Sequence, residues 1–352
     1  MKTIIKLKSV VLIAALLLSG SMMGSAEEMQ SKKTKEVSRS YTTDRNSLLS
    51  VDNTYGNIVI THWNKNEISI KVVIEAKAKT DNRANQLLEQ VYIEINKSGN
   101  TISAVTKLKN VNAGNNEQLK INYIINMPAD MQNKLTQKYG NITMPDKNEG
   151  ISTIKVMYGN MKGGEFTKDL KIDCSYGNVK LGRVYSADVK LSYSNLDQSN
   201  YADNINIAAN YSEVKLKDVK NLTISSNYGN LKAGRITIAN MNFKYGNIDM
   251  GSLSESLKAD VDYGNINLES LSSNFRQIDI KAQYGNIDIN IPSNAAFNME
   301  AKNMKYGKLD MKGFNSNVRN ENNNMYTTVN GGGSRTIKID GKGYSNVKIK
   351  AL

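Results

Sequence analysis

The sequence predicts an all-β fold, a single-chain parallel β-helix or β-solenoid of roughly 17–22-residue rungs with an N-terminal cap that contains one short helix. Three observations predict it. A Tyr-Gly-Asn motif recurs along most of the chain, apolar residues alternate with polar ones around each copy, and only one segment has helical spacing. Successive tyrosines of the motif lie 17 to 22 residues apart, at Tyr139, Tyr158, Tyr176, Tyr193, Tyr211, Tyr228, Tyr245, Tyr263, Tyr284 and Tyr306.

Residues 1–26 predict a signal peptide. Lys2, Lys6 and Lys8 precede an apolar run at 10–18, which is too short to span a bilayer and is followed by small residues. No second long apolar run follows, so we expect no transmembrane segment after signal cleavage. The chain is therefore expected to be exported to the periplasm, the cell surface or the extracellular space.

The remaining chain is basic and has one cysteine. Its formal net charge falls from +13 to +10 when residues 1–26 are removed, because they contain three lysines and no acid. Residues 27–40 are polar and aperiodic, which predicts a flexible leader. Cys174 cannot form an intrachain disulfide, and its alternation with Leu170 and Ile172 predicts a buried side chain rather than a reactive or metal-binding one.

Residues 41–135 predict an N-terminal β cap. They contain a first motif copy at Tyr55, and 84 residues then separate it from Tyr139. A helix is expected near 81–93, with Asp81 as its N-cap and an apolar stripe along one side. The open end of a solenoid exposes core and unpaired backbone, so this region is expected to cover it. Cap strands are expected at 68–72, 101–108 and 119–127.

The repeat array is expected to span 136–311. Before each tyrosine every second residue is mostly apolar, as Ile172 is before Tyr176, so period two predicts a strand with the tyrosine facing inward. After the tyrosine the apolar residues stand at the third and fifth positions, as Val179 and Leu181 do. The chain must therefore bend at the Gly-Asn step, where glycine supplies backbone freedom and asparagine tolerates left-handed geometry.

Stacked copies would bury a core that one copy cannot bury alone. Equivalent residues would lie about 4.8 Å apart and form tyrosine, asparagine and aliphatic ladders. Glu213 and Lys308 replace the asparagine, so their rungs are expected to lack a ladder partner. Residues 312–352 are expected to be closing strands, with Tyr344 in a last degenerate copy. The alternative to parallel stacking is a series of antiparallel hairpins in one sheet.

The Tyr-Gly-Asn-apolar-x-apolar repeats behind a signal peptide resemble the secreted bacterial putative-adhesin β-solenoid family of the head-GIN type, a domain of unknown function. The resemblance covers roughly 51–350. It implies a stacked, right-handed parallel β-helix that is exported to the periplasm or the cell surface. No functional residues come with this resemblance, so none is transferred to this chain.

The residue chemistry predicts neither an enzyme nor a cofactor or metal site. His62 is the only histidine, so a histidine-based metal cluster is excluded, and its place beside Trp63 after the first motif copy predicts a residue of the cap and not part of a Ser-His-Asp triad. The acids are scattered over exposed positions instead of being paired. The sequence contains no calcium-binding Gly-Gly-x-Gly-x-Asp repeat and no phosphate-binding loop.

One outward column carries the candidate ligand-binding residues, which are Lys162, Lys180, Lys215 and Lys232. Stacked like charges are unfavourable unless they are screened or matched by a ligand. The alternative is that these lysines are solvated charges that only protect the strands against aggregation. The column is the fourth position after each tyrosine and reads Thr143, Lys162, Lys180, Asp197, Lys215, Lys232, Asp249, Asn267, Asp288 and Asp310.

Two classes of function follow. The first is a non-enzymatic, adhesin-like binding module that contacts an anionic polysaccharide or another cell-envelope component. The second is a structural or oligomerising envelope protein whose array acts as a spacer without a specific ligand. Nucleic acid is not expected as a partner, because the tyrosines are predicted to face inward and the fold offers no element that reads a groove. Neither the ligand nor a homo-oligomeric state can be read from the sequence.

Overall fold

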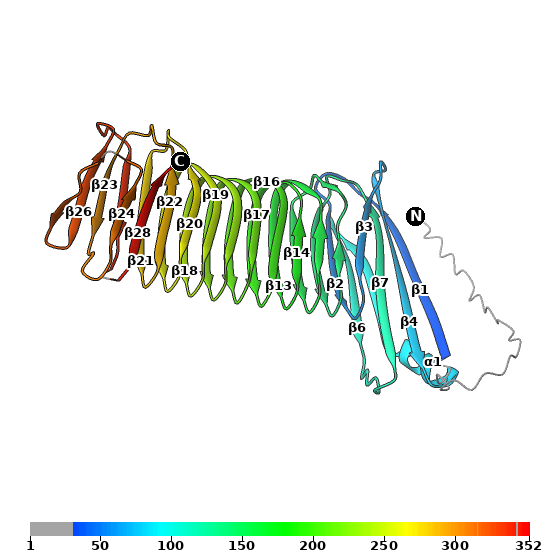
Figure 1. The fold of residues 1–352 in the computed structure, drawn as a ribbon. Helices are drawn as coiled ribbons and strands as arrows, with labels where there is room; N and C mark the ends of the chain where they lie inside the picture. The colour runs from blue at the N-terminus through cyan, green and yellow to red at the C-terminus, as the bar shows by residue number, and fades with distance from the viewer. Residues whose placement is uncertain (1–30, 315, 343) are drawn as a thin grey trace, which may run out of the picture.

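The computed structural model describes residues 31–314, 316–342 and 344–352, so the predicted signal peptide lies outside the described residues. The prediction of an all-β chain is confirmed for this part, in which 28 strands form one sheet and a single short helix is present. Figure 1 shows an elongated stack with long strands at its N-terminal end. No helix within these ranges is long and apolar enough to cross a membrane.

The N-terminal region is larger than the expected cap, because a strand replaces most of the expected leader. Strand β1 pairs antiparallel with β4 along its whole length. Ion pairs such as Lys32–Glu75 (2.6 Å) join the two strands, and Val37 and Tyr41 pack against the core. The flexible leader predicted for 27–40 is therefore wrong from Ser31 onward. The elements here are β1 (Ser31–Thr42), β2 (Leu48–Thr54), β3 (Ile58–His62), β4 (Glu67–Ala78), α1 (Asp81–Glu89), β5 (Val91–Ser98), β6 (Thr101–Leu108) and β7 (Gln118–Met127).

Helix α1 is shorter than the predicted 81–93. Its N-cap is Thr80 rather than Asp81, since the Thr80 hydroxyl accepts a hydrogen bond from the Arg83 N–H. Leu87 and Leu88 are buried, as the apolar stripe predicted. The helix ends before Val91, because the β-branched residues that follow favour the strand β5.

An ion pair ties α1 to the loop before β7. The Arg83 guanidinium donates to both carboxylate oxygens of Glu117, at 2.6 and 2.9 Å, and the Gly114 N–H donates to the same carboxylate at 2.8 Å. The hydrogen bonds from Arg83, followed by that from Gly114, lower the pKa of Glu117 from its usual 4.5 to about 2. Arg83 and the Gly114 N–H therefore bind the charged carboxylate of Glu117 more strongly than its neutral carboxyl form.

The repeat array follows the cap. Its strands are β8 (Gln132–Lys138), β9 (Ile142–Thr143), β10 (Lys147–Asn148), β11 (Ser152–Met157), β12 (Met161–Gly163), β13 (Glu165–Ser175), β14 (Asn178–Leu181), β15 (Val184–Ser192), β16 (Asn195–Asn210), β17 (Val214–Asn227), β18 (Leu231–Lys244), β19 (Ile248–Asp262), β20 (Ile266–Leu271), β21 (Gln277–Gln283) and β22 (Asn286–Ile291). Neighbouring copies pair in parallel and in register, as Ile172 with Val189 and Val189 with Ile207. Antiparallel hairpins are therefore excluded for this part of the chain.

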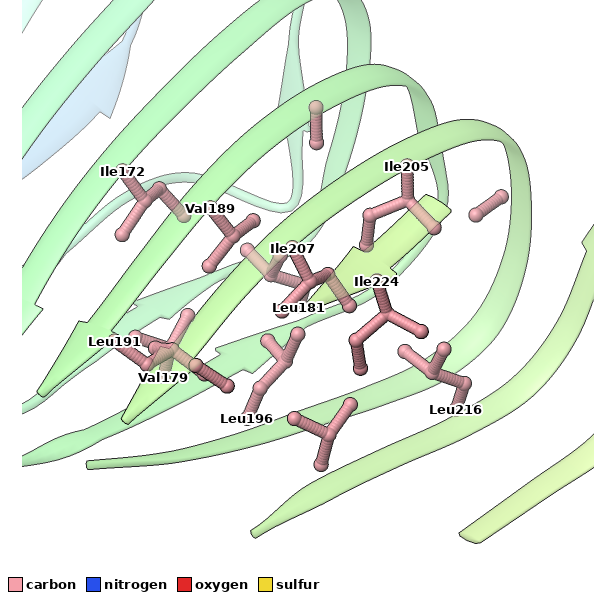
Figure 2. Close-up of a cluster of buried hydrophobic side chains, with 14 of the residues drawn as sticks. Ile172, Val179, Leu181, Val189, Leu191, Leu196, Ile205, Ile207, Leu216 and Ile224 are labelled. Carbon is pink, nitrogen blue, oxygen red and sulfur yellow. The ribbon is translucent and has the colours of Figure 1, made fainter. Parts of the chain in front are cut away.

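The core of the array lies between two walls of each turn. Ile172, Val189 and Ile207 come from successive strands of one wall, and Val179 and Leu181 come from another wall (Figure 2). All five side chains are at most 4% exposed. The prediction that alternate residues before the tyrosine, and the third and fifth residues after it, face the core is thus confirmed. Cys174 is also buried, and burial raises the pKa of its thiol, as expected for a structural cysteine.

The bend between the two phases lies at the tyrosine itself, not at the Gly-Asn step. The φ angle of Tyr176 is +57°, and nine further tyrosines of the repeated motif have φ angles in the same left-handed region. A left-handed residue reverses which side of the chain the next side chains point to. The tyrosine therefore turns outward, while the residues two before and three after it point inward.

Glycine follows the tyrosine because successive turns approach too closely for a Cβ. A Cβ on Gly246 would lie 1.9 Å from the carbonyl oxygen of Gly229 in the neighbouring turn. Three turns carry serine here, at Ser194, Ser212 and Ser345, and their hydroxyls form hydrogen bonds to the neighbouring turn. The Gly177 N–H donates to Ser194 Oγ at 3.2 Å, and the Ser194 N–H donates to Ser212 Oγ at 3.1 Å.

The last strands of the sequence do not lie at the end of the stack. The expected closing strands of 312–352 do form, but β27 lies between β21 and β23, and β28 lies between β22 and β24. The end of the stack is instead covered by β25 and β26, which pair antiparallel. These elements are β23 (Phe297–Lys302), β24 (Leu309–Lys312), β25 (Arg319–Glu321), β26 (Asn324–Val329), β27 (Thr336–Asp340) and β28 (Asn346–Ala351).

The first prediction concerns the close approach of the turns. Gly246→Ala should lower the free energy of unfolding by about 3 kcal/mol, because the new Cβ forces neighbouring backbone apart. Gly246→Ser should cost less, since its hydroxyl can hydrogen-bond between turns as Ser194 and Ser212 do. Urea unfolding followed by circular dichroism measures both. Gly114→Ala is the control, because its Cβ would meet only the Glu117 side chain at 3.7 Å. Equal midpoints for all three variants would contradict the proposed contact.

A second prediction follows from the low pKa of Glu117. A carboxyl group with a lowered folded-state pKa stabilises the fold above its usual pKa, and this contribution is lost as the pH falls from about 4.5 towards about 2. Glu117→Gln should therefore lower the urea midpoint at pH 7, and the difference from wild type should shrink at pH 3. A difference that does not change with pH would show that the Glu117 charge does not hold the helix.

Candidate binding surface

A continuous ladder of tyrosine rings runs along the outside of the stack. Neighbouring ring centroids are 4.7 to 5.4 Å apart and the rings are inclined by 1° to 23°. Tyr344 lies between Tyr284 and Tyr306, because β27 and β28 enter the stack there. The ladder, in its order along the stack, is Tyr55, Tyr139, Tyr158, Tyr176, Tyr193, Tyr211, Tyr228, Tyr245, Tyr263, Tyr284, Tyr344 and Tyr306.

The inward orientation predicted for these tyrosines is wrong. Their exposed fractions run from 38% at Tyr55 to 60% at Tyr306. In ten of the twelve, the left-handed backbone of the tyrosine reverses the side that the alternation predicts. Each ring covers the faces of its neighbours, so the ladder presents ring edges and hydroxyl groups. Nucleic-acid bases need free ring faces for stacking, and the interior of this ladder offers none.

An asparagine ladder runs parallel to the tyrosines. The Asn160 side-chain and backbone N–H groups both donate to Asn141 Oδ1, at 3.1 and 2.9 Å. Glu213 continues the ladder, because its backbone N–H donates to Asn195 and its carboxylate accepts from the Asn230 amide at 2.8 Å. The prediction that the Glu213 rung lacks a partner is therefore wrong. Lys308 also donates its backbone N–H to Asn346, at 3.2 Å.

The structure brings the four candidate lysines into one column. Lys162 pairs in register with Lys180, Lys180 with Asp197, Asp197 with Lys215, and Lys215 with Lys232. All five side chains are exposed. Within the described residues, none of the four lysines forms an ion pair. The sequence predicts this column because the fourth position after each tyrosine keeps one phase in every turn.

A shallow groove separates the lysine column from the asparagine ladder. Lys162, Lys180 and Lys215 line it together with Asp197 and the polar side chains of the asparagine ladder. Lys215, Lys217 and Lys232 line an adjoining groove together with the carboxylates of Asp197, Asp249 and Glu269. Lys217 was not among the sequence candidates, because it stands two positions beyond the column. The surface can therefore offer positive charge beside a row of amide hydrogen-bonding groups.

The acidic half of the column is not the uninterrupted run that the sequence order suggests. Lys348 pairs in register with Asp288 on one side and with Asp310 on the other. The inserted strand β28 thus places a cation between two carboxylates. Within the described residues, the one stretch of the column in which lysines stand next to each other lies in its N-terminal half, around Asp197.

The single histidine and the side chains that can bind metals were the other candidates for a site. His62 is half-buried at the end of β3, and burial lowers its pKa, against the raising effects of the Lys147 backbone and Glu149. The described ranges contain no group of three or more histidine, cysteine or carboxylate side chains that could hold a metal ion. The lysine column and its groove are therefore the surface with the most distinctive chemistry.

Comparisons with known proteins identify a family. The family model described as Toastrack DUF4097 matches residues 30–343. A search among curated proteins found no match.

Several solved structures show a likeness at low identity. A putative cell adhesion protein from Clostridium sporogenes is 12% identical, with 90% of this chain and 100% of that chain covered and a TM-score of 0.18. A putative adhesin from Parabacteroides merdae is 14% identical, with coverages of 73% and 90% and a TM-score of 0.31. A putative lipid binding protein from Parabacteroides distasonis is 13% identical, with coverages of 90% and 96% and a TM-score of 0.27. At these values the likenesses carry no inference about ligands.

The tyrosine ladder gives a third prediction. Tyr228 contacts Tyr211 and Tyr245, each with ring centroids 4.8 Å apart. Tyr228→Ala should lower the free energy of unfolding by about 1–3 kcal/mol, because two ring contacts are lost while the left-handed backbone remains. Tyr228→Asn should be more stable than Tyr228→Ala by up to about 1 kcal/mol, since asparagine tolerates this backbone. Chemical denaturation compares the two, with Tyr228→Phe as a control that keeps the rings. An asparagine variant less stable than the alanine variant would refute the role assigned to the backbone.

Proposed function

The chain belongs to the Toastrack DUF4097 family, and we propose that it is an exported, non-enzymatic binding module of the bacterial cell envelope. In this proposal its array is a parallel β-solenoid with rungs of 17–22 residues. Its ligand is an extended anionic polysaccharide, which lies along the stack beside the tyrosine and asparagine ladders. The chain would thus act as an adhesin-like protein.

The observation that carries the proposal is a column in which two pairs of lysines stand next to each other and, within the described residues, form no ion pair with the neighbouring Asp197 and Asp249. Lys162 stands next to Lys180, and Lys215 stands next to Lys232, on adjacent parallel strands. Like charges on adjacent strands repel each other, and other columns of this protein do pair opposite charges. Arg235, for example, donates to both carboxylate oxygens of Asp218 at 2.9 and 2.7 Å. A bound polyanion would remove the repulsion within the lysine column.

A repeating ligand suits this surface better than a small one. The lysines form two pairs separated by Asp197, and the groove beside them is shallow and continuous across several turns. Each contact between an exposed lysine and a carboxylate is weak, but several contacts along one polymer reinforce each other. The asparagine amides and tyrosine hydroxyls could hydrogen-bond to sugar hydroxyls along the same line.

A second candidate function is that of a structural or oligomerising envelope spacer without a specific ligand. It is favoured by the tyrosine ladder, which is continuous from Tyr55 to Tyr306 and makes its contacts without any ligand. In that case the lysines would be solvated charges that discourage edge-to-edge aggregation.

The fourth prediction separates the two candidates. Changing Lys162, Lys180, Lys215 and Lys232 to glutamine should weaken binding to alginate, a polymer of uronic acids, by about tenfold. Titration of the soluble chain onto immobilised alginate measures the Kd. About 0.5 M salt should produce a similar loss in the wild type, since the Debye length then shrinks to roughly 4 Å.

The matched control changes four other exposed lysines to glutamine, so that the net charge falls equally. Lys171, Lys190, Lys258 and Lys281 serve this purpose, because they lie on the strands that precede the tyrosines. This variant should retain most of its alginate affinity. Equal losses in both variants would reduce the effect to net charge, and no loss in either would support the spacer.

A further inference from the structure

Strands β27 and β28 stand out of sequence order within the stack. Ile337 pairs in register with Ile278 on one side and with Met299 on the other. Val347 likewise pairs with Ile287 and with Leu309. The turn that contains β21 and β22 and the turn that contains β23 and β24 are therefore not in direct contact through these strands. The space between them is filled by β27 and β28, which come later in the sequence.

This segment, residues 336–351, is held by contacts with groups that are remote from it in sequence. Ile337, Ile339, Val347 and Ile349 are all buried, at no more than 1% exposure. The Ser345 hydroxyl donates to the carbonyl oxygen of Ala282 at 2.9 Å. These contacts do not depend on the segment belonging to the same chain.

Aromatic and charged contacts also join this segment to residues that are remote from it in sequence. Tyr344 stacks on Tyr284 at 4.7 Å and on Tyr306 at 5.1 Å. Lys342 Nζ lies 2.9 Å from carboxylate oxygens of both Asp260 and Asp262 on β19. The segment thus completes the tyrosine column and is anchored to a turn beyond the space that it fills.

The connection to β26 has the properties of a hinge. Gly331, Gly332 and Gly333 have φ angles of +81°, +75° and +131°. Gly331 and Gly333 are exposed and no atom lies within 4 Å of their Cβ positions, whereas Gly332 lies against Asn298 and Thr328 and the Gly333 carbonyl oxygen accepts one hydrogen bond from Asn298, at 2.8 Å. Three glycines in succession can reorient the following strand at low conformational cost.

We propose that β27 and β28 are an exchangeable strand pair that can fill the same space in a second copy of this chain. Two copies would then form a reciprocal dimer in which each makes the contacts described above with its partner. The second copy would supply Tyr344, Asn346 and Lys348 to the tyrosine, asparagine and charged columns. This inference does not depend on the ligand proposed above.

The experiment uses two full-length single-site variants, one with Asp279→Cys and the other with Lys338→Cys. These residues pair in register across the boundary between β21 and β27. When the two proteins are mixed, incubated overnight and oxidised, exchange places the new cysteines of different chains side by side. We expect a disulfide-linked heterodimer on a non-reducing gel, with the linked peptides identified by mass spectrometry. Cys174 can stay in both chains, because it is buried.

The control pair is Lys190→Cys and Ala208→Cys, which also face each other in register but lie in consecutive turns of the array. Exchange there would require the array to unravel, so this pair should give no heterodimer. Deletion of Gly331, Gly332 and Gly333 should raise the heterodimer yield of the first pair, because the shortened loop hinders return to the chain's own space. If the first pair gives no more heterodimer than the control with the native hinge, the proposal is overturned, whether or not the deletion variant folds.

Discussion

Most turns of the stack depend on a tyrosine held in the left-handed region and on a glycine after it, whose backbone lies too close to the neighbouring turn for a Cβ. A left-handed L-residue costs about 1–2 kcal/mol, and ten tyrosines adopt this conformation. Ring stacking between neighbours returns about 0.5–1.5 kcal/mol for each contact. The cost is therefore offset only when another copy lies alongside, so one turn is unstable by itself. The glycine after the tyrosine is likewise needed only when copies stack, because the contact that leaves no room for a Cβ forms between neighbouring turns.

This constraint separates the outward positions by their freedom to vary. The second position after the tyrosine is asparagine or glutamate where the ladder depends on a side-chain acceptor, as the bonds around Glu213 show. The fourth position carries Thr143, Lys162, Asp197 and Asn267 in turns that stack equally well. It has no fixed part in the stacking, so its charge can change without changing the fold. The tyrosine and asparagine ladders maintain the backbone. The residues at the fourth position can therefore determine which ligand is bound.

The regular features of the fold could be predicted from the sequence, because they depend on alternation and spacing. Ile172 was expected to face the core from its alternation before Tyr176, and the same reasoning placed Lys162 and Lys180 in one column. The orientation of the tyrosines could not be predicted in this way, since counting alternate residues assumes an extended backbone throughout. One left-handed residue reverses the count, and a bulky side chain rarely adopts that conformation.

Two other features escaped prediction because their partners are remote in sequence. Strand β1 has few apolar residues, and its pairing with β4 is supported by cross-strand ion pairs such as Lys71–Glu36 (3.0 Å), which alternation does not reveal. The position of β27 and β28 was missed because the order of copies in the sequence was taken as their order in space. Tyr344 was recognised as a degenerate copy of the motif, but nothing in its local sequence indicates that it stacks before Tyr306.

The two ends of the stack solve the problem of exposed strand edges differently. At the N-terminal end, α1 contacts β1, β4 and β5. Strand β1 pairs antiparallel with β4 and forms the edge of the sheet, and its charged side chains discourage pairing with another strand. At the other end, β25 and β26 cover β23, which is joined to the rest of the sheet through β27. The C-terminal cover is thus attached to the array by a strand that arrives later in the chain. Until that strand is in place, β21 and β23 both present unpaired edges, and these edges match the same segment of any copy of the chain.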